Sequence, residues 1–531
     1  MKAGWRQSMA WLHTWCGLWF SWLLYAIFLT GTLAVFDEAI THWMSPEHAL
    51  EEHRAAPPAP VAASERRQRL ALGAAYMAKA HARADMWEIW PINRNDNNAL
   101  SAYWFNQQGG YAEARLDPAS GAPLSAGAAG KPVRPTYGGH HFVDFHYELH
   151  AGNTGLWITA VAAMAMLVAL VSGIVTHKRI FKDFFTFRPA KGQRSWLDAH
   201  NAVAVLTLPF LFMIAYTGIA ISSVTLMPAP LLAHYGPGAD NMKQFLADLG
   251  GPARVARSGH ALAMPDLETF AARAEALMGQ AVRCVVIDNP GDSSMRIGVY
   301  GWDNEAEAMT RITNTSGMVS FSAASGKVLA VRQPGEVDGG AASLTRLAMG
   351  SLHMASFGGL ATRWLYFVCG LAGTAMMATG AILFMVKRRN RHGAEFGDAT
   401  ARVYRLIEGV NVAAIAGLAI ACAAYLWANR LLPTDLDQRA GWELRVFFGV
   451  WLAALAHGLL RAPARAWREQ LWAVAALCVL LAPLNWITTG DHLLAQIGGR
   501  ADWESAGVEL AALLAGAVAA CAALKQRGST A

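Results

Sequence analysis

The chain has 531 residues, of which 54% are hydrophobic and 15% are charged. A soluble protein of this size needs a larger charged surface, so the composition excludes an ordinary soluble enzyme and indicates an integral membrane protein. The net charge of +6 does not indicate nucleic-acid binding, because the basic residues lie between apolar segments and form no single patch. Five of the six cysteines lie in apolar segments and none forms a CxxC motif, which argues against an iron–sulfur cluster, a c-type haem and a disulfide framework.

Eight apolar segments are candidates to cross a bilayer, and most of them approach the ~20 residues that a crossing requires. We expect these spans at residues 15–36, 156–176, 203–224, 364–386, 409–427, 446–460, 471–487 and 508–524. Acidic residues follow the first span where a signal peptidase site would need small residues, so this span is not a cleaved signal peptide. The sequence therefore predicts a polytopic α-helical membrane protein.

The distribution of positive charge predicts the orientation. Lysine and arginine gather before the first span, between the second and third, after the fourth, between the sixth and seventh, and after the eighth. With eight spans all of these positions fall on one side, so both termini are expected in the cytoplasm. The long segments 37–155 and 225–363 are then periplasmic.

The two periplasmic segments have similar outlines. In the first, we expect a helix over 64–84 and strands at 86–91, 99–106 and 111–116, separated by turns. In the second, we expect a helix over 265–278 and strands at 282–287, 295–300, 310–314 and 319–322. Both segments are therefore small α+β modules.

The order of span, outer module and span occurs twice, which gives a parallel internal repeat over residues 1–395. The expected parts are a first span (1–36), a first periplasmic module (37–155), spans two and three with a basic cytoplasmic loop (156–224), a second periplasmic module (225–363), a fourth span (364–395) and an appended module of four spans (396–531).

Histidines recur at matching places in this repeat. His13 and His200 each lie eighteen residues before the glycine of a Thr-Gly pair, and His150 and His353 each follow a leucine just before a span. Imidazoles on facing helices are standard axial ligands of haem iron. We therefore predict two b haems, one held by His13 and His200 near the inner surface and one by His150 and His353 near the outer surface. Capping of a helix end or contact with lipid headgroups is the alternative explanation.

Six further residues enter this prediction. His177 ends the second span on the side of His13 and His200, so it either replaces one of them as a haem ligand or bonds a propionate. Arg179 and Arg188 either pair with propionates or serve only as positive charge on the inner side. His146, one turn before His150, is expected beside the ligands or the substrate. His140 and His141 are expected in a loop.

Several of these motifs, in this order, resemble a known family. Leu12-His13-Thr14-Trp15, the stretch from Gly173 to Arg188, Ser195-Trp196-Leu197-Asp198-Ala199-His200 and Leu352-His353 are similar to the PepSY-associated transmembrane proteins. The resemblance covers about residues 1–395 and does not extend to 400–531. It implies that the outer modules are PepSY-like, and it suggests the activity of those members that are inner-membrane ferric-siderophore reductases with b-type haem.

The expected function is electron transfer across the inner membrane to a ferric siderophore, with release of Fe(II). The sequence has no dinucleotide-binding GxGxxG at a strand–helix junction and no Walker loop, so the electrons must come from a quinol, a partner reductase or a cytoplasmic reductant. Two other functions stay open. In one, the outer modules bind or regulate periplasmic peptidases, and in the other, the spans transport the siderophore.

Overall fold

A computed structural model describes residues 3–47, 61–93, 99–105, 111–124, 134–176, 193–237, 244–245, 255–301, 312–313, 315–337, 339–391, 396–500 and 502–527. The chain divides into two compact units. Unit 1 comprises residues 1–51, 132–219 and 361–531, and unit 2 comprises residues 52–131 and 220–360. Each unit is described by itself.

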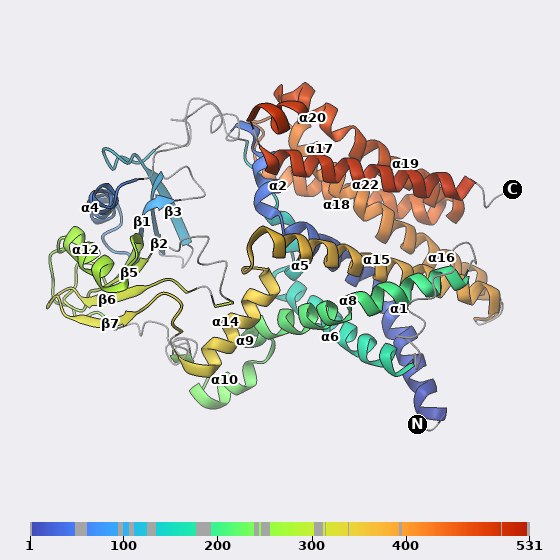
Figure 1. Ribbon diagram of the computed structural model, residues 1–531, viewed down its shortest axis with the longest axis horizontal. Helices are drawn as coiled ribbons and strands as arrows, with labels where there is room; N and C mark the ends of the chain where they lie inside the picture. The colour runs from blue at the N-terminus through green and yellow to red at the C-terminus, as the bar shows by residue number, and fades with distance from the viewer. Residues whose placement is uncertain are drawn as a thin grey trace. The chain divides into compact units, whose positions relative to one another are not determined.

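Unit 1 is helical and contains the membrane spans (Figure 1). Eight helical segments of the described chain are long and apolar enough to cross a membrane, which confirms the predicted multi-pass architecture. Six spans are single helices, namely α1 (Ala3–Ala34), α6 (Gly152–Thr176), α8 (Gln193–Ile221), α15 (Gly359–Arg391), α18 (Arg439–Leu460) and α22 (Trp503–Arg527). The fifth span joins α16 (Thr400–Val412) to α17 (Leu418–Leu431), and the seventh joins α19 (Pro463–Val479) to α20 (Leu481–Thr489).

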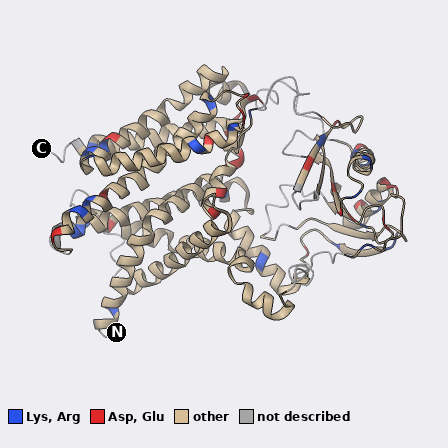
Figure 2. Ribbon diagram, turned by 180° about the vertical axis from the view of Figure 1, so that it is seen from behind, with Lys and Arg blue, Asp and Glu red and all other residues tan. Residues whose placement is uncertain are grey.

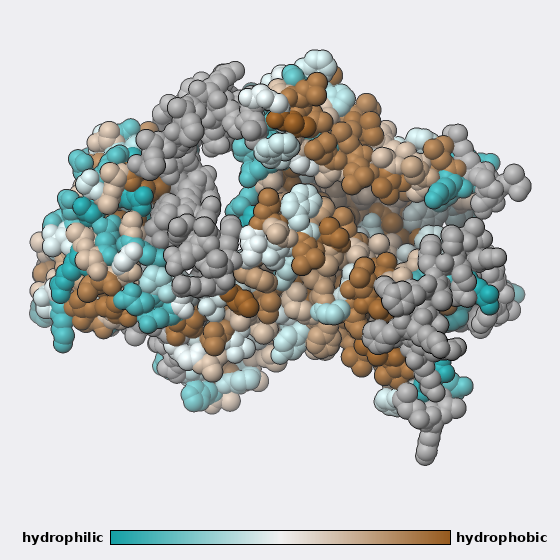
Figure 3. Space-filling view, in the orientation of Figure 1, coloured by the Kyte–Doolittle hydropathy of each residue, from teal (hydrophilic) through white to brown (hydrophobic). Residues whose placement is uncertain are grey.

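Lysine and arginine gather at one end of the unit 1 helices, where α1 begins and α15 and α22 end (Figure 2). We call this the basic end and the other the opposite end. Between them, apolar side chains cover the helix surfaces, as the brown areas over α17, α19 and α22 show (Figure 3). Exposed large apolar residues on these helices, such as Leu452, Leu460 and Leu514, fit contact with lipid tails.

Two short helices at the opposite end were not predicted. α2 (Asp37–Met44) continues the chain directly after α1, and α5 (His140–Glu148) precedes α6. His140 and His141, expected in a loop, are the first two residues of α5, and the expectation was wrong because the Gly138-Gly139 pair marks a helix start as well as a turn. α5 ends at Leu149, whose φ of 53° is left-handed.

The appended module packs against the first repeat in one continuous core. Leu418, Cys422, Tyr425 and Phe447 of the module are buried together with residues of α1, α2 and α5. Between α16 and α17 the chain forms a π-helical segment, Ala413–Gly417, which exposes backbone carbonyls. The module is therefore part of the same folded body as the first two spans.

Two of these exposed carbonyls have side-chain donors. The Trp451 indole donates to the Ala413 carbonyl at 3.0 Å, and the Tyr25 hydroxyl of α1 donates to the Ile415 carbonyl at 3.3 Å. The π-helical segment thus supplies one of the polar contacts between the appended module and α1.

A buried network of polar side chains ties the module to the first repeat at the opposite end. The guanidinium of Arg439 and the carboxylate of Glu443, both fully buried, lie 2.6 Å apart. Glu443 also accepts from Asn429 at 2.9 Å and from the Thr136 hydroxyl at 2.6 Å. Both charges in this group have a partner, as burial in an apolar surrounding requires. Arg430 lies 3.7 Å from the centre of the Trp43 ring, which adds a cation–π contact with α2.

Unit 2 is built on one antiparallel sheet with the strand order β3-β2-β1-β4-β5-β6-β7. The strands are β1 (Met86–Asn93), β2 (Ala99–Phe105), β3 (Tyr111–Leu116), β4 (Val282–Asp288), β5 (Arg296–Gly301), β6 (Met318–Ser322) and β7 (Val328–Arg332). The two predicted modules are joined edge to edge, because β1 of the first pairs with β4 of the second, with Trp87 opposite Ile287. The joined sheet was not predicted.

The helices α4 (Ala63–Ala80) and α12 (Leu267–Met278) pack on the face of this sheet that carries its buried apolar residues, among them Ile89, Leu100, Val285 and Ile297 (Figure 1). α12 begins at Asp266, whose carboxylate accepts from the backbone amides of Glu268 and Thr269, an ordinary N-cap. The predicted strand 310–314 falls mostly outside the described residues, and β7 was missed. Unit 2 also contains α9 (Ser223–Leu226), α10 (Pro228–Tyr235) and α14 (Gly340–Met354).

Candidate functional site

The structure brings His13 and His200 together inside unit 1. His13 lies on α1 and His200 on α8, and their ring centroids are 6.4 Å apart with an angle of 65° between the ring planes. The two residues lie 187 positions apart in the chain, as do Gly31 and Gly218. The contact between them is the one that the repeat predicts. We call these two histidines the basic-end pair.

The Nδ1 atom of His13 is hydrogen-bonded to the backbone of the partner helix in its own repeat. It lies 2.8 Å from the carbonyl oxygen of Ala169 on α6. A carbonyl can only accept, so His13 carries its proton on Nδ1 and Nε2 is the unprotonated nitrogen. An N–H that points away from the metal-binding nitrogen and bonds a carbonyl is the usual way in which a histidine ligand is oriented.

His200 has an equivalent partner. Its Nδ1 lies 3.3 Å from the hydroxyl oxygen of Thr379 on α15. That hydroxyl donates its own proton to the carbonyl of Met376 at 3.0 Å, so it accepts from His200. Nε2 of His200 is therefore also unprotonated.

A glycine allows each ring to approach the partner helix. A Cβ atom placed on Gly173 would lie 3.1 Å from Cε1 of His13, and one placed on Gly380 would lie 3.4 Å from Cε1 of His200. Gly173 and Gly380 lie 207 positions apart and are equivalent in the repeat. We call this arrangement, in which a histidine ring lies on a glycine with Nδ1 bonded to the same helix, the histidine cradle.

The basic-end pair fits one iron between two imidazoles. An iron bound at about 2 Å by a nitrogen of each ring requires ring centroids roughly 6 Å apart, close to the observed 6.4 Å. Gly17, one turn after His13, borders open space, since no atom lies within 4 Å of a Cβ placed there. Among the described residues no group of three or more His, Cys, Asp or Glu side chains could hold a metal ion.

The other residues predicted for this end, namely His177, Arg179 and Arg188, lie outside the described residues. Arg388 at the end of α15, which was not predicted for the site, is described, and its guanidinium lies 5.1 Å from the ring centres of both Trp15 and Phe384. Positive charge is thus placed near the basic-end pair by α15.

At the opposite end, the same cradle occurs again with His146 of α5. Its Nδ1 lies 2.8 Å from the carbonyl oxygen of Ile27 on α1. A Cβ atom placed on Gly31, one turn further along α1, would lie 2.5 Å from that Nδ1. Ile27 precedes Gly31 by four residues, as Ala169 precedes Gly173 in the His13 cradle. The sequence analysis placed His146 only beside the ligands or the substrate. The offset of 207 positions that relates Gly173 to Gly380 also relates His146 to His353, and this offset could have singled His146 out.

His150 has different surroundings. Its Nε2 lies 2.8 Å from Nδ1 of His141, and the two rings are stacked at 5.0 Å with an angle of 11°. His141 is fully buried, and His150 is partly buried. Leu149 and His150 both have left-handed φ angles, of 53° and 52°, a costly conformation for residues other than glycine.

His353 lies in unit 2, one residue before the end of α14. The 207-position offset that relates Gly173 to Gly380 also relates Trp157 to Trp364, and it relates His353 to His146. His146 lies two residues before the end of α5, whereas His150 lies beyond that end. By both measures the counterpart of His353 in the first repeat is His146.

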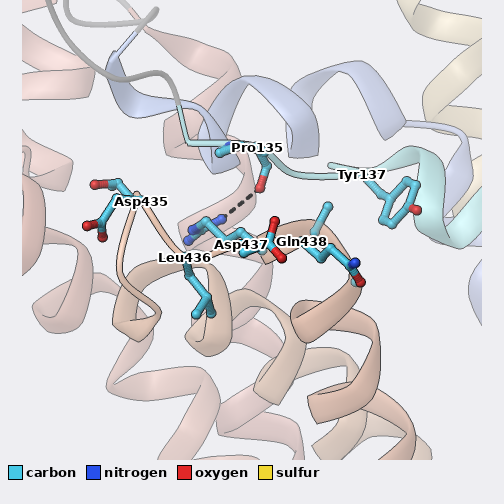
Figure 4. A pocket seen from close by; sticks show the side chains of 10 residues that line it. Pro135, Tyr137, Asp435, Leu436, Asp437 and Gln438 are labelled. Carbon is cyan, nitrogen blue, oxygen red and sulfur yellow. Dashed lines mark hydrogen bonds between the residues drawn. The ribbon is translucent and has the colours of Figure 1, made fainter.

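An open hollow lies at the start of α18, beside the segment that leads to α5 (Figure 4). It has a volume of about 650 Å³, and Asp435 and Asp437 are among the residues that line it. Arg439 also lines it, but the guanidinium is engaged, with Nη1 3.0 Å from the Pro135 carbonyl. No histidine lines the hollow, so it is separate from the candidate ligands.

Comparison with known proteins agrees with this architecture. Residues 10–387 match the model of the PepSY-associated TM region. The chain is also 26% identical over 356 residues to an uncharacterized protein of Pseudomonas aeruginosa, an overlap that covers 64% of this chain and 84% of the relative. The chain therefore belongs to the PepSY-associated transmembrane family, with a further four-span module after the family region.

Proposed function

We propose that this protein is a two-haem electron-transfer protein of the bacterial inner membrane that reduces a ferric siderophore in the periplasm. The observation that supports it best is the basic-end pair, in which two unprotonated imidazole nitrogens belong to rings 6.4 Å apart. Neutral imidazoles on opposing helices are the ligand set of a low-spin haem that transfers electrons.

The basic end is the cytoplasmic end in this proposal, by the excess of lysine and arginine there. His13 and His200 would hold the cytoplasmic haem, and the residues of α15 near them would meet its propionates. The cradles orient the two rings, which fixes the geometry that sets the haem potential.

For the periplasmic haem we propose His146 as a ligand in place of His150. His146 has the cradle seen at His13, and its position in the repeat matches that of His353. The Nε2 atom of His150 lies at hydrogen-bond distance from His141. Each electron delivered by such a chain reduces one Fe(III) to Fe(II), which a chelator selected for Fe(III) holds weakly.

The test is haem content. Protein produced with ample haem should bind two b haems per chain in a pyridine haemochrome assay. His13→Ala and His200→Ala should each leave one haem, and so should His146→Ala. His140→Ala is the matched control, because that side chain is exposed and should not affect either haem.

Activity is tested with the reduced protein in detergent. Addition of a ferric hydroxamate or ferric catecholate should oxidise both haems and release Fe(II) that ferrozine traps. Two retained haems in both His13→Ala and His200→Ala would contradict the ligand assignment, and haems that stay ferrous in excess ferric chelate would contradict the reductase activity.

A further inference from the structure

The His141–His150 pair contains a buried polar atom that its surroundings do not satisfy. His141 is fully buried, and its Nδ1 is occupied by the bond to His150. Its Nε2 is buried and has no hydrogen-bond partner among the described residues. An unsatisfied buried polar atom costs about 1–3 kcal/mol, so its retention needs an explanation such as a bound molecule.

The appended module supplies the walls around this atom. The ring of His141 lies 4.4 Å from that of Tyr425 and 4.5 Å from that of Phe447, with Phe142 of α5 at 4.9 Å. The Tyr425 hydroxyl donates to the Gly138 carbonyl at 2.9 Å, so it does not serve His141. With Nδ1 of His141 as the donor in its bond to His150, Nε2 is an acceptor, and a molecule that meets it has a flat apolar body and one O–H or N–H donor.

The membrane provides access to this place. Phe448 lies 6.0 Å from the His150 ring and is 36% exposed, and Leu452, one turn further along α18, is 67% exposed. Both lie in a candidate membrane span, so this face meets lipid. A hydroquinone is an aromatic molecule with hydroxyl donors that dissolves in lipid.

The two histidines also form a path for a proton. Burial, and then the neighbouring His150, lower the pKa of His141 to about 3, so the neutral ring is present at physiological pH. A neutral imidazole accepts a proton at one nitrogen as it gives one up at the other. Here a proton that arrives at Nε2 of His141 releases the Nδ1 proton to Nε2 of His150, which is only partly buried.

We propose that His141, Tyr425 and Phe447 form a binding site for a membrane hydroquinone, and that His141 and His150 conduct its protons to water. Oxidation of one hydroquinone to the quinone releases two protons and two electrons. The two electrons would pass to the haems of the proposed function, on which this inference rests. The first proton leaves through His141 and His150, and the second follows once the pair has released the first.

The experiment separates the site from the haems. Protein in lipid nanodiscs is first reduced with dithionite, so that it cannot oxidise the probe, and is then titrated anaerobically with menadiol; bound menadiol is measured after rapid filtration. Wild-type protein and His140→Ala should bind about one menadiol per chain, and His141→Phe should bind at least tenfold more weakly. Phe447→Trp, which enlarges a side chain packed against His141 and leaves both histidines intact, should weaken binding similarly. Equal binding by wild type and both site variants would overturn the proposal.

A kinetic arm tests the redox step. Menadiol should reduce the haems of the wild type in stopped flow, and His141→Phe should slow this at least tenfold, whereas dithionite should reduce both proteins fully. Menadiol reduction at the wild-type rate in His141→Phe would overturn the proton path. If the protein holds no haem, the proposed function fails, and the binding arm still decides whether the quinone site exists.

Discussion

The two ends of the unit 1 helices use the same histidine cradle in different settings. At the basic end, one cradle comes from each repeat, and His13 and His200 face each other. At the opposite end of unit 1, α5 carries His141, His146 and the start of the segment to His150, and the appended module packs against it. The cradle is thus a local product of two helices, whereas the surroundings of a histidine depend on which other helices pack there.

The cradles also differ in tightness, which yields the prediction with the largest effect. A Cβ on Gly31 would lie 2.5 Å from the His146 ring, compared with 3.1 Å for Gly173 and His13 and 3.4 Å for Gly380 and His200. Gly31→Ala should displace the His146 ring, break its bond to Ile27 and remove the opposite-end haem.

Haem content measured across the three alanine variants checks this comparison. We expect the haem loss to be complete for Gly31→Ala, partial for Gly173→Ala and smallest for Gly380→Ala. The reverse order would show that the haems are not held by these rings.

The second prediction concerns the polar network, which occurs at the opposite end and joins the appended module to the first repeat. Glu443→Leu leaves the buried guanidinium of Arg439 without its carboxylate. Breaking one partner from a buried ion pair costs about 3–5 kcal/mol. The thermal unfolding midpoint should fall accordingly.

Glu469→Leu is the matched control. The Glu469 carboxylate pairs with Arg461, the residue that follows α18, and both side chains are partly exposed. Exposed pairs contribute about 0–1 kcal/mol. Equal destabilisation by the two variants would mean that the network does not hold the module in place.

The third prediction is the pH dependence that His141 gives to the opposite end. Burial, and then His150, lower the pKa of His141 from 6.5 to about 3 in the folded protein. The unfolded chain therefore binds the proton more readily between these values. Stability is full above pH 6.5 and is lost as the pH falls toward 3.

Unfolding midpoints of wild type and His141→Gln over this range measure the effect. The wild type should lose more stability than the variant as the pH falls, since other acid-sensitive groups are common to both. Parallel curves would show that His141 is not buried in its neutral form.

The membrane spans and the basic-end pair were predictable because each depends on a signal that the sequence itself carries. Apolar length gives the spans, and the internal repeat alone places His13 opposite His200. The cradle at His146 was not predicted, because the adjacent Leu-His pattern favoured His150. Subtracting the 207 positions that separate Gly173 from Gly380 would have identified His146 as the counterpart of His353.

The contacts that could not be predicted join distant segments. The pairing of β1 with β4 depends on two strands whose edges carry no signature of their partner. The burial of His141 depends on Tyr425 and Phe447, which lie roughly 300 residues further along the chain. A polar residue at a helix start is ordinary until the helix that covers it is known.

The smallest expected effect distinguishes the two halves of the basic-end pair. Nδ1 of His13 bonds a backbone carbonyl, which no side-chain substitution removes, whereas Nδ1 of His200 bonds the Thr379 hydroxyl. Thr379→Val removes the hydrogen bond that orients the His200 ring, which should weaken haem binding by about 1 kcal/mol. The haem should then transfer to apomyoglobin about fivefold faster. Thr379→Ser keeps the hydroxyl and should restore the wild-type rate. Identical rates for valine and serine would mean that the glycine contact alone orients His200, and the two cradles would then differ in kind.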